Sequence, residues 1–321
     1  MKKLSILLTK HYRPISIAAL LDVFQTVNHY YQENTGMPYF DIRLIRHPED
    51  GTVAFPDEQY QPLHHEEVTV SDLVLIPAFR PGNISDYLRE NSAFIPWVRQ
   101  QAAKGAEVAS FCTGAFMLAA TGLLDQRRAT THVTAVEALS RIFPEVIVDA
   151  DVVVTDDRGV YTSGGATSTF HLLLHILEKY CDRSTAIYTA KVFAIDMDRA
   201  GQSYFANWSP SRAHNDELVT AAQQRMEERF QDRVTVEEVI HDLPVSRRNF
   251  IRRFKTATGI TPIEYLQRIR IEAAKKLLEG KQENITGVMI QAGYEDAKAF
   301  RQLFRKIVGL SPKEYREKYA G

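Results

Sequence analysis

Two spacings of apolar residues divide the chain. Over the first two hundred residues, short apolar runs predict strands at 4–9, 40–45 and 72–78, while apolar residues three or four apart predict helices at 15–31 and near 93–104. Continuous apolar runs are typical of parallel strands, which are buried on both faces, and the helices between them would cover those faces. This part of the sequence therefore predicts an α/β sandwich built on a mostly parallel sheet.

The segment 107–119 predicts a strand that turns sharply into a helix, with Cys112 at the bend. The amide groups at the start of such a helix favour a thiolate and can bind anionic groups. His132 follows twenty residues later, so the two residues could act as nucleophile and base. Spacing alone favours a simpler alternative, in which Cys112 is a small buried residue and His132 is an unrelated, hydrogen-bonded histidine.

The last hundred residues predict helices throughout, including two helix-turn-helix patterns. The first spans 235–258, with Ser246 as the N-cap of its second helix. The second begins at 285, turns at Gly293, where a positive φ is tolerated, and enters its second helix near Asp296. The repeated pattern predicts two similar units in one all-α domain.

A long helical pattern at 263–279 would form a rigid connector between the two units. The first turn contains Pro244 at a place where helix-turn-helix turns usually have glycine. Because proline cannot adopt a positive φ, the second copy is the stronger prediction.

The second helix of each pattern has an apolar face that can pack and a polar face that can reach a DNA groove. The apolar residues are Phe250, Phe254 and Ala257 in the first copy and Phe300, Leu303, Phe304 and Ile307 in the second. The candidate DNA-contacting residues are Arg248, Ile251, Arg252 and Lys255, then Ala297, Lys298, Arg301, Gln302 and Arg305. An isolated basic face is usually only solvated, but its repetition in two units favours a DNA contact.

The chain of 321 residues, 45% hydrophobic, is long enough for two domains with their own cores. We expect the first domain at 1–205, a polar linker at 206–215 and the helical domain at 216–321. The last segment holds 20 Lys and Arg against 16 Asp and Glu, a formal charge of +4, so the rest carries −5 of the total of −1. Only the helical domain therefore favours phosphate, and only modestly.

Several separated motifs of the helical domain resemble the AraC/XylS family of transcription regulators. They are Gly259 to Tyr265, Arg270, Ala274, Leu277, Gly293-Tyr294, Phe300, Phe304-Arg305 and Gly309 to Arg316. The resemblance implies a seven-helix domain whose two reading helices enter successive major-groove segments of double-stranded promoter or operator DNA, about 34 Å apart. It also implies a regulator, more often an activator, that can contact RNA polymerase.

The first domain resembles the PfpI-like sensor domain of the class I glutamine-amidotransferase-like superfamily, which implies a flavodoxin-like fold. The shared motifs are Cys112 to Ala115, Gly122 to Asp125, Arg128 to His132, Thr162 to Gly165 and Gly201-Gln202. Together, the two domains resemble GlxA-type AraC regulators, which implies a homodimer formed through the sensor domain.

In enzymatic relatives, a glutamate from the first strand-helix connection supports the cysteine, and the matching position here is Ser16. The family's usual Gly-Pro is also replaced, by Ala19-Leu20. We therefore expect no enzyme activity, and a small-molecule effector held near Cys112, Thr113, His132 and Ser16. The competing hypotheses are a Cys-dependent hydrolase or lyase tethered to DNA, and an architectural DNA binder with a degenerate first domain.

Neither a cofactor nor a metal is expected. His171 and His175 are four residues apart on one helix and could share a zinc ion, but no third ligand is evident, so hydrogen bonding is the better interpretation. Cys112 and Cys181 lie far apart with no zinc-like spacing. No apolar run of about 20 residues and no signal-peptide pattern occurs, so a cytoplasmic protein is expected.

Overall fold

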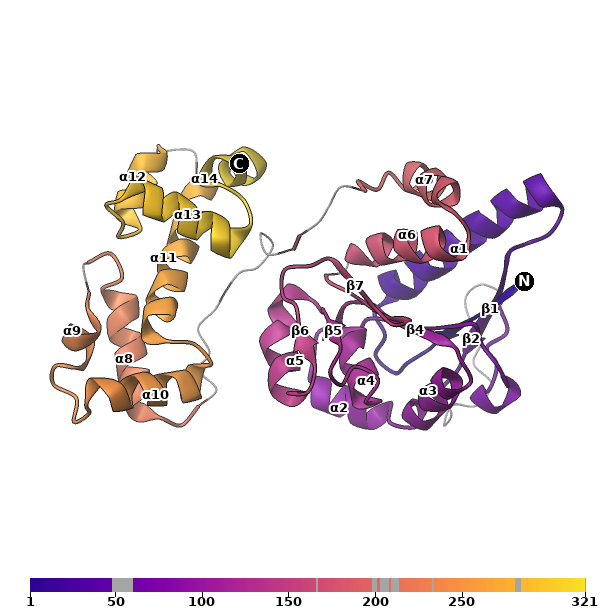
Figure 1. The fold of residues 1–321 in the computed structure, drawn as a ribbon, viewed down its shortest axis with the longest axis horizontal. Helices are drawn as coiled ribbons and strands as arrows, with labels where there is room; N and C mark the ends of the chain where they lie inside the picture. Colours follow the sequence, from indigo (N-terminus) through magenta and orange to yellow (C-terminus); the bar gives the residue numbers. More distant parts are fainter. Residues whose placement is uncertain are drawn as a thin grey trace. The chain divides into compact units, whose positions relative to one another are not determined.

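The chain divides into two units, Met1–Gln202 and Ser203–Gly321 (Figure 1). The computed structural model describes residues 1–47, 60–165, 167–197, 201–202, 208, 214–232, 234–280 and 284–320. Most of the expected linker at 206–215 lies outside these residues; of its members only Trp208, His214 and Asn215 are described.

The first unit is built on a six-stranded sheet with the strand order β2-β1-β3-β4-β8-β7. All neighbouring strands are parallel except β7, which runs antiparallel to β8 at one edge. The strands are β1 (Lys2–Leu7), β2 (Phe40–Ile45), β3 (Leu73–Ile76), β4 (Glu107–Ser110), β7 (Val154–Asp157) and β8 (Val160–Ser163), with a separate pair β5 (Arg128–Ala129) and β6 (Ile147–Val148). The predicted mostly parallel sheet is confirmed.

Helices cover both faces of this sheet (Figure 1). One face carries α1 (Pro14–Thr35), α6 (Ser168–Tyr180) and α7 (Arg183–Val192), and the other α2 (Ile84–Glu90), α3 (Phe94–Ala103), α4 (Ala115–Ala120) and α5 (Val136–Ile142). Short 3-10 turns are η1 (His65–Glu67), η2 (Cys112–Gly114) and η3 (Val133–Ala135). Side chains alternate between the two cores along each strand: Leu73 and Leu75 face α1, while Val74 and Ile76 face α3 and α4.

The second unit consists of seven helices among its described residues. They are α8 (Glu217–Glu228), α9 (Val236–Ile240), α10 (Arg247–Thr258), α11 (Pro262–Glu279), α12 (Ile285–Gln291), α13 (Ala297–Val308) and α14 (Pro312–Tyr319). The helix α11 contributes Tyr265 to one hydrophobic core and Ile271, Ala274 and Leu278 to the other. It is thus the predicted connector.

The two halves of this unit are the same structural motif repeated fifty residues apart. In the first half, Phe254 packs edge-on against Phe250 and Tyr265, with ring centroids 5.4 and 5.2 Å away. In the second half, Phe304 makes the same contacts with Phe300 and Tyr315, at 5.8 and 5.7 Å. Each reading helix ends at a glycine with φ near +80°, Gly259 or Gly309, and each next helix opens with a capping box. The repeat therefore extends beyond the two helix-turn-helix patterns into the helix that follows each.

None of the helices in the described part of the chain combines the length and the apolar character that crossing a membrane requires.

Candidate functional sites

The bend after β4 places Cys112 in a backbone conformation that few residues adopt. Its φ is +54°, and it is followed directly by η2 and α4. Gly114 lies so close to the end of β3 that a Cβ there would stand 2.6 Å from the carbonyl oxygen of Pro77. The sharp elbow predicted from the sequence is present, and it is packed tightly against the neighbouring strand.

Hydrogen bonds join both the elbow and the start of α1 to the loop that follows β3. The Thr113 hydroxyl accepts from the Phe79 amide at 2.9 Å, and the Ser16 hydroxyl accepts from the Ala78 amide at 3.1 Å. On the other side, the Thr131 hydroxyl donates to the Cys112 carbonyl at 2.9 Å, one residue before His132. The structure thus brings Ser16, Cys112, Thr113 and His132 to the same carboxyl-terminal edge of the sheet.

Burial favours the neutral form of both the thiol and the imidazole of this site. Cys112 is only 1% exposed, and burial raises the pKa of its thiol. Burial, followed by the positive charge of Arg13, lowers the pKa of His132. Both shifts oppose the thiolate and imidazolium pair that activates catalytic cysteines.

A buried glutamine, Gln202, links the loops beside the elbow. The Gln202 amide nitrogen donates to the Thr130 hydroxyl and the Thr131 carbonyl, both at 3.0 Å, and its oxygen accepts from the Gly165 amide at 3.1 Å. Gln202 is 1% exposed. It fixes the segment that carries His132 against the loop after β8.

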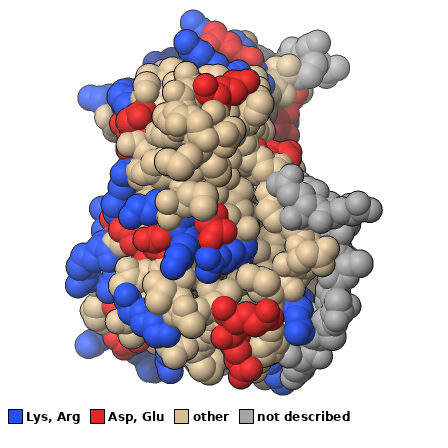
Figure 2. Space-filling model, turned by 90° about the vertical axis from the view of Figure 1, so that its right-hand side faces the viewer, with Lys and Arg blue, Asp and Glu red and all other residues tan. Residues whose placement is uncertain are grey.

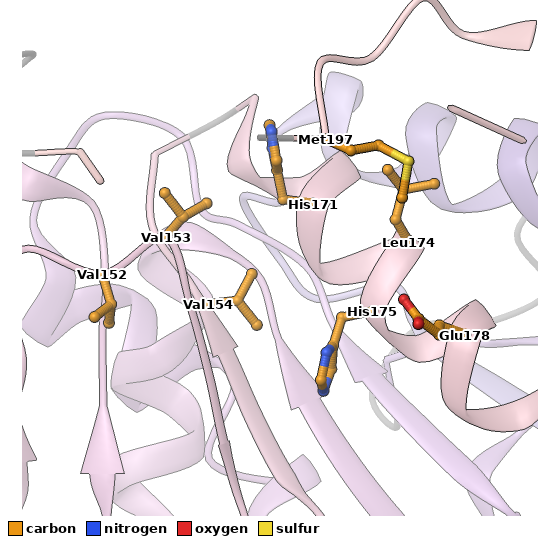
Figure 3. Close-up of a pocket in the computed structure, with 8 residues that line it drawn as sticks. All are labelled: Val152, Val153, Val154, His171, Leu174, His175, Glu178 and Met197. Atoms are coloured by element: carbon orange, nitrogen blue, oxygen red, sulfur yellow. The ribbon is translucent and has the colours of Figure 1, made fainter. Parts of the chain in front are cut away.

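A separate groove of about 330 Å³ lies between the edge strand β7 and α6 (Figure 3). Its walls include Val154, Leu174 and the two histidines noted in the sequence. His171 donates through Nε2 to the Asp196 carbonyl at 2.9 Å, and His175 Nε2 lies 2.9 Å from the Asp156 carboxylate. Among the described residues, no group of three His, Cys, Asp or Glu side chains could hold a metal ion. Each histidine thus has a hydrogen-bond partner at 2.9 Å.

The two candidate reading helices, α10 and α13, are both capped at the N-terminus, and Ser246 is the cap predicted for α10. The Ser246 hydroxyl accepts from the Asn249 amide, and the Asp296 carboxylate accepts from the amides of Lys298 and Ala299. The phenylalanines on the apolar faces are fully buried. Each helix is thus fixed to its core along one face, which leaves the polar face open.

Ion pairs sort the cations of the reading helices into two groups. On α10, Arg247 pairs with Glu237 at 2.7 Å, and Arg253 forms a two-pronged contact with Asp216. The exposed cations with no carboxylate at ion-pair distance in the described chain are Arg248, Arg252, Lys255, Lys298, Arg301, Arg305 and Lys306. All of the basic candidates from the sequence belong to this second group.

The uncharged candidates differ in exposure. Ala297 and Gln302 are exposed on α13, whereas Ile251 is half-buried and packs against the core of the first half. Ile251 occupies the position that Arg301 holds in the repeat, so the two reading helices present different side chains at equivalent positions.

On the molecular face in Figure 2, acidic and basic side chains are interspersed. Charge density alone therefore marks no binding surface on that face.

Comparisons with known proteins match each unit separately. Residues 240–318 match a family described as a helix-turn-helix domain, and residues 43–179 match the DJ-1/PfpI family. The HTH-type transcriptional regulator CdhR of Pseudomonas aeruginosa is 26% identical over 226 residues, which cover 70% of this chain and 67% of CdhR. GbdR, a regulator of the same type and species, is 24% identical over 70% of this chain and 61% of its own length.

A solved AraC family transcriptional regulator from Pseudomonas putida aligns with a TM-score of 0.50 and 17% identity, over 60% of this chain and 100% of that structure. The present chain joins a DJ-1/PfpI domain to an AraC-type helix-turn-helix domain. The names of its relatives support a DNA-binding regulator of transcription.

One feature of the DJ-1/PfpI domain was not identified from the sequence. Arg13, the residue immediately before α1, is half-buried, and its charge acts on both Cys112 and His132. A basic residue directly ahead of the first helix was the only sequence signal that could have indicated it.

Iodoacetamide should modify Cys112 slowly at neutral pH and faster as the pH rises, because the raised pKa of the thiol keeps it protonated and burial limits access. Mass spectrometry of the alkylated peptide, with glutathione as the reference thiol, measures the rate. Cys181, whose pKa burial raises to about 12, is the internal control in a Cys112→Ser variant. Modification of Cys112 faster than glutathione at neutral pH would contradict a neutral thiol.

Proposed function

We propose that the chain is a sequence-specific regulator of transcription in which the AraC-type domain binds operator DNA and the DJ-1/PfpI domain senses a small metabolite. The observation that carries this proposal is the repeated reading helix, with each copy anchored by buried phenylalanines and each presenting exposed cations that have no carboxylate at ion-pair distance among the described residues. Such cations can pair with phosphates or with guanine edges in the major groove. We further propose a cytoplasmic protein that acts as an activator.

The proposed DNA contacts divide by chemistry. Arginine can form two hydrogen bonds to guanine, lysine supplies charge for phosphates, and glutamine can recognise adenine. The proposed contacts are Arg248, Ile251, Arg252, Lys255, Ala297, Lys298, Arg301, Gln302 and Arg305. Because Ile251 stands where the second copy has Arg301, we expect the two half-sites to differ in sequence, with an apolar contact such as a thymine methyl at the first.

We propose that the elbow binds its effector without catalysis. Ser16 supplies a hydroxyl where enzymatic relatives have a carboxylate, and that hydroxyl is already bonded to the Ala78 amide. The proposed ligand contacts are Cys112, Thr113, His132 and Ser16. A Cys-dependent hydrolase remains the second candidate because the strained φ of Cys112 is typical of a nucleophile elbow. The Cys112→Ala variant separates the two: a sensor still changes its DNA occupancy with the metabolite, at a higher metabolite concentration because one ligand contact is lost, whereas an enzyme loses turnover.

We propose that effector binding alters DNA occupancy through the linker at 206–215 and through a homodimer of DJ-1/PfpI domains. Trp208 supports this role for the linker, because its ring packs edge-on against Tyr265 of α11 at 5.2 Å and lies under the Arg268 guanidinium. Since α11 contributes side chains to both cores of the AraC-type domain, a displacement of Trp208 that moves α11 can also move both reading helices. The effector would act by binding one arrangement more tightly than the other. A contact with RNA polymerase would complete activation.

Selection of duplexes from a random pool by the full-length protein tests the DNA proposal. The Arg301→Ala variant should bind the selected duplex more weakly by about 1–3 kcal/mol and lose preference at one base pair, because a guanidinium that reads a base contributes on that scale. Lys313→Ala, on α14 and paired with Glu317, is the matched control and should bind normally. Unchanged affinity and preference in Arg301→Ala would remove Arg301 from the interface. Failure to enrich any sequence would contradict the regulator itself.

A further inference from the structure

We propose that Arg270 is a positioning residue that fixes the two reading helices relative to each other, and thereby sets the spacing of the two DNA half-sites that the chain accepts. This inference rests on the proposed DNA contacts of α10 and α13. It gives a role to a residue that lies on α11, outside both reading helices.

The Arg270 side chain connects α11 to residues 229–232, which follow α8 in the first half of the AraC-type domain. Its Nε donates to the Phe230 carbonyl and its Nη2 donates to the Asp232 carbonyl, both at 2.7 Å. Because the guanidinium is a rigid planar fork, two such bonds fix its orientation as well as its distance. The turn after α8 is thereby held against the middle of α11.

The same guanidinium also contacts the second half of the domain. Its central carbon lies 5.5 Å from the centre of the Tyr294 ring, within the range of a cation–π attraction. Tyr294 lies in the turn between α12 and α13, and its ring packs against Phe300 of α13 with centroids 5.3 Å apart. We call the contacts of Arg270 with Phe230, Asp232 and Tyr294 the Arg270 bridge. The bridge connects the turn after α8 to the start of the second reading helix.

The backbone at Gly293 is independent evidence that the two halves meet at this place. A Cβ on Gly293 would stand 2.7 Å from the Phe230 carbonyl oxygen and 3.0 Å from Arg270 Nε. Only a residue without a side chain allows so close an approach. The turn of the second helix-turn-helix is therefore packed directly against the turn after α8.

The two copies of the repeated motif differ where the bridge is made. Fifty residues before Gly293 and Tyr294, the first copy has Leu243 and Pro244. Leu243 packs against the core of its own half, and proline offers no aromatic face to a guanidinium. The Gly293-Tyr294 pair thus serves the contact between the halves in addition to forming a turn.

The bridge matters for DNA because each half has its own core, and α11 contributes side chains to both. A helix can bend, so α11 fixes the distance between the halves better than the angle between them. A second contact beside α11 restrains that angle. Half-sites one helical turn apart are separated by about 10 base pairs, so one extra base pair rotates the second half-site by roughly a tenth of a turn. Reading helices held at a fixed angle therefore accept one spacing.

The first test measures binding of the full-length protein to its selected duplex and to duplexes with one base pair inserted or removed between the half-sites. The wild type should lose roughly tenfold or more in affinity on either change, because one reading helix loses base contacts. Arg270→Gln should reduce this ratio about threefold or more, since the bonds that restrain the angle are lost. Arg270→Lys, which keeps the charge but not the fork, should give an intermediate ratio.

Two controls separate positioning from general destabilisation. Arg225→Gln removes a bond to the Val239 carbonyl and an ion pair with Asp242, both within the first half, and should leave the spacing ratio unchanged. Gly293→Ala should lower the ratio as the loss of the guanidinium does. Gly259→Ala introduces a side chain at the same φ of +81°, but with no atom within 4 Å of its Cβ, and should keep the wild-type ratio.

The second test needs no DNA. Thr256→Cys on α10 and Lys306→Cys on α13, at equivalent positions of the repeat, carry spin labels in a variant without the native cysteines. Pulsed electron paramagnetic resonance then gives the distribution of distances between the two reading helices. Arg270→Gln should broaden this distribution, whereas Arg225→Gln should leave it as in the wild type.

Three results would overturn the inference. The first is an unchanged spacing ratio or an unchanged distance distribution in Arg270→Gln that circular dichroism shows to be folded. The second is equal broadening in Arg225→Gln, because general loosening of the domain would then explain the effect. The third is a wild type that binds all three duplexes equally well. If the wild type selects no duplex, the proposed DNA contact fails, and the distance measurement still decides whether Arg270 fixes the two halves.

Discussion

Replacing Phe304 by alanine should lower the free energy of unfolding of the AraC-type domain by about 3–5 kcal/mol, because the ring is fully buried and its loss leaves a cavity. The ring contacts both Phe300 and Tyr315, so the cavity would loosen α13 and α14 together. Urea unfolding followed by circular dichroism measures the change, and binding to a selected duplex should fall with it.

The repeat provides a matched pair for this experiment. Phe254→Ala removes the equivalent ring from the first core and should cost a similar amount. Leu303→Ala, beside Phe304 but only half-buried, should cost less. If Phe304→Ala and Leu303→Ala unfolded at the same urea concentration, the second core would not depend on the Phe304 ring.

Replacing Gly114 by alanine should destabilise the DJ-1/PfpI domain by roughly 3 kcal/mol or more, the upper range for forcing a group into a packed interior. The φ of Gly114 is −58°, which any residue adopts, so space alone requires glycine here. A Cβ would stand 2.6 and 2.7 Å from the carbonyl oxygens of Pro77 and Ile76, which are backbone atoms and cannot rotate away. Thermal unfolding of the full-length protein would measure the loss.

Gly201→Ala is the control for this substitution. A Cβ at Gly201 would lie 3.6 Å from the nearest atom of Asp151, an ordinary contact. We expect this variant to unfold at nearly the wild-type temperature. If Gly114→Ala also unfolded at nearly the wild-type temperature, the elbow would be less tightly packed than its contacts indicate. The proposal that it is a preformed ligand site would then lose support.

Pro244 illustrates a limit of local rules. A rule that requires glycine in the turn disfavours the first helix-turn-helix, because proline cannot adopt a positive φ. In the structure, the chain turns without a positive φ at this place, using a bond from the Leu243 amide to the Ile240 carbonyl at 2.9 Å and another from Val245 to Leu243 at 2.7 Å. Pro244 lies between Leu243 and Val245; it has no amide hydrogen to donate, and neither of these two hydrogen bonds requires one. A different turn therefore joins the same two helices.

The sequence by itself determined the elements, their caps and the faces of the reading helices, because these depend on residues within a few positions of one another. Apolar spacing defined α13, Asp296 capped it, and the cations fell on the face away from Phe300 and Phe304. Only the tertiary structure decided which cations remain unpaired and which groups meet at the elbow. Arg13, His132 and Gln202 are distant in the chain, and their contacts follow from strand order and loop packing that no local pattern encodes.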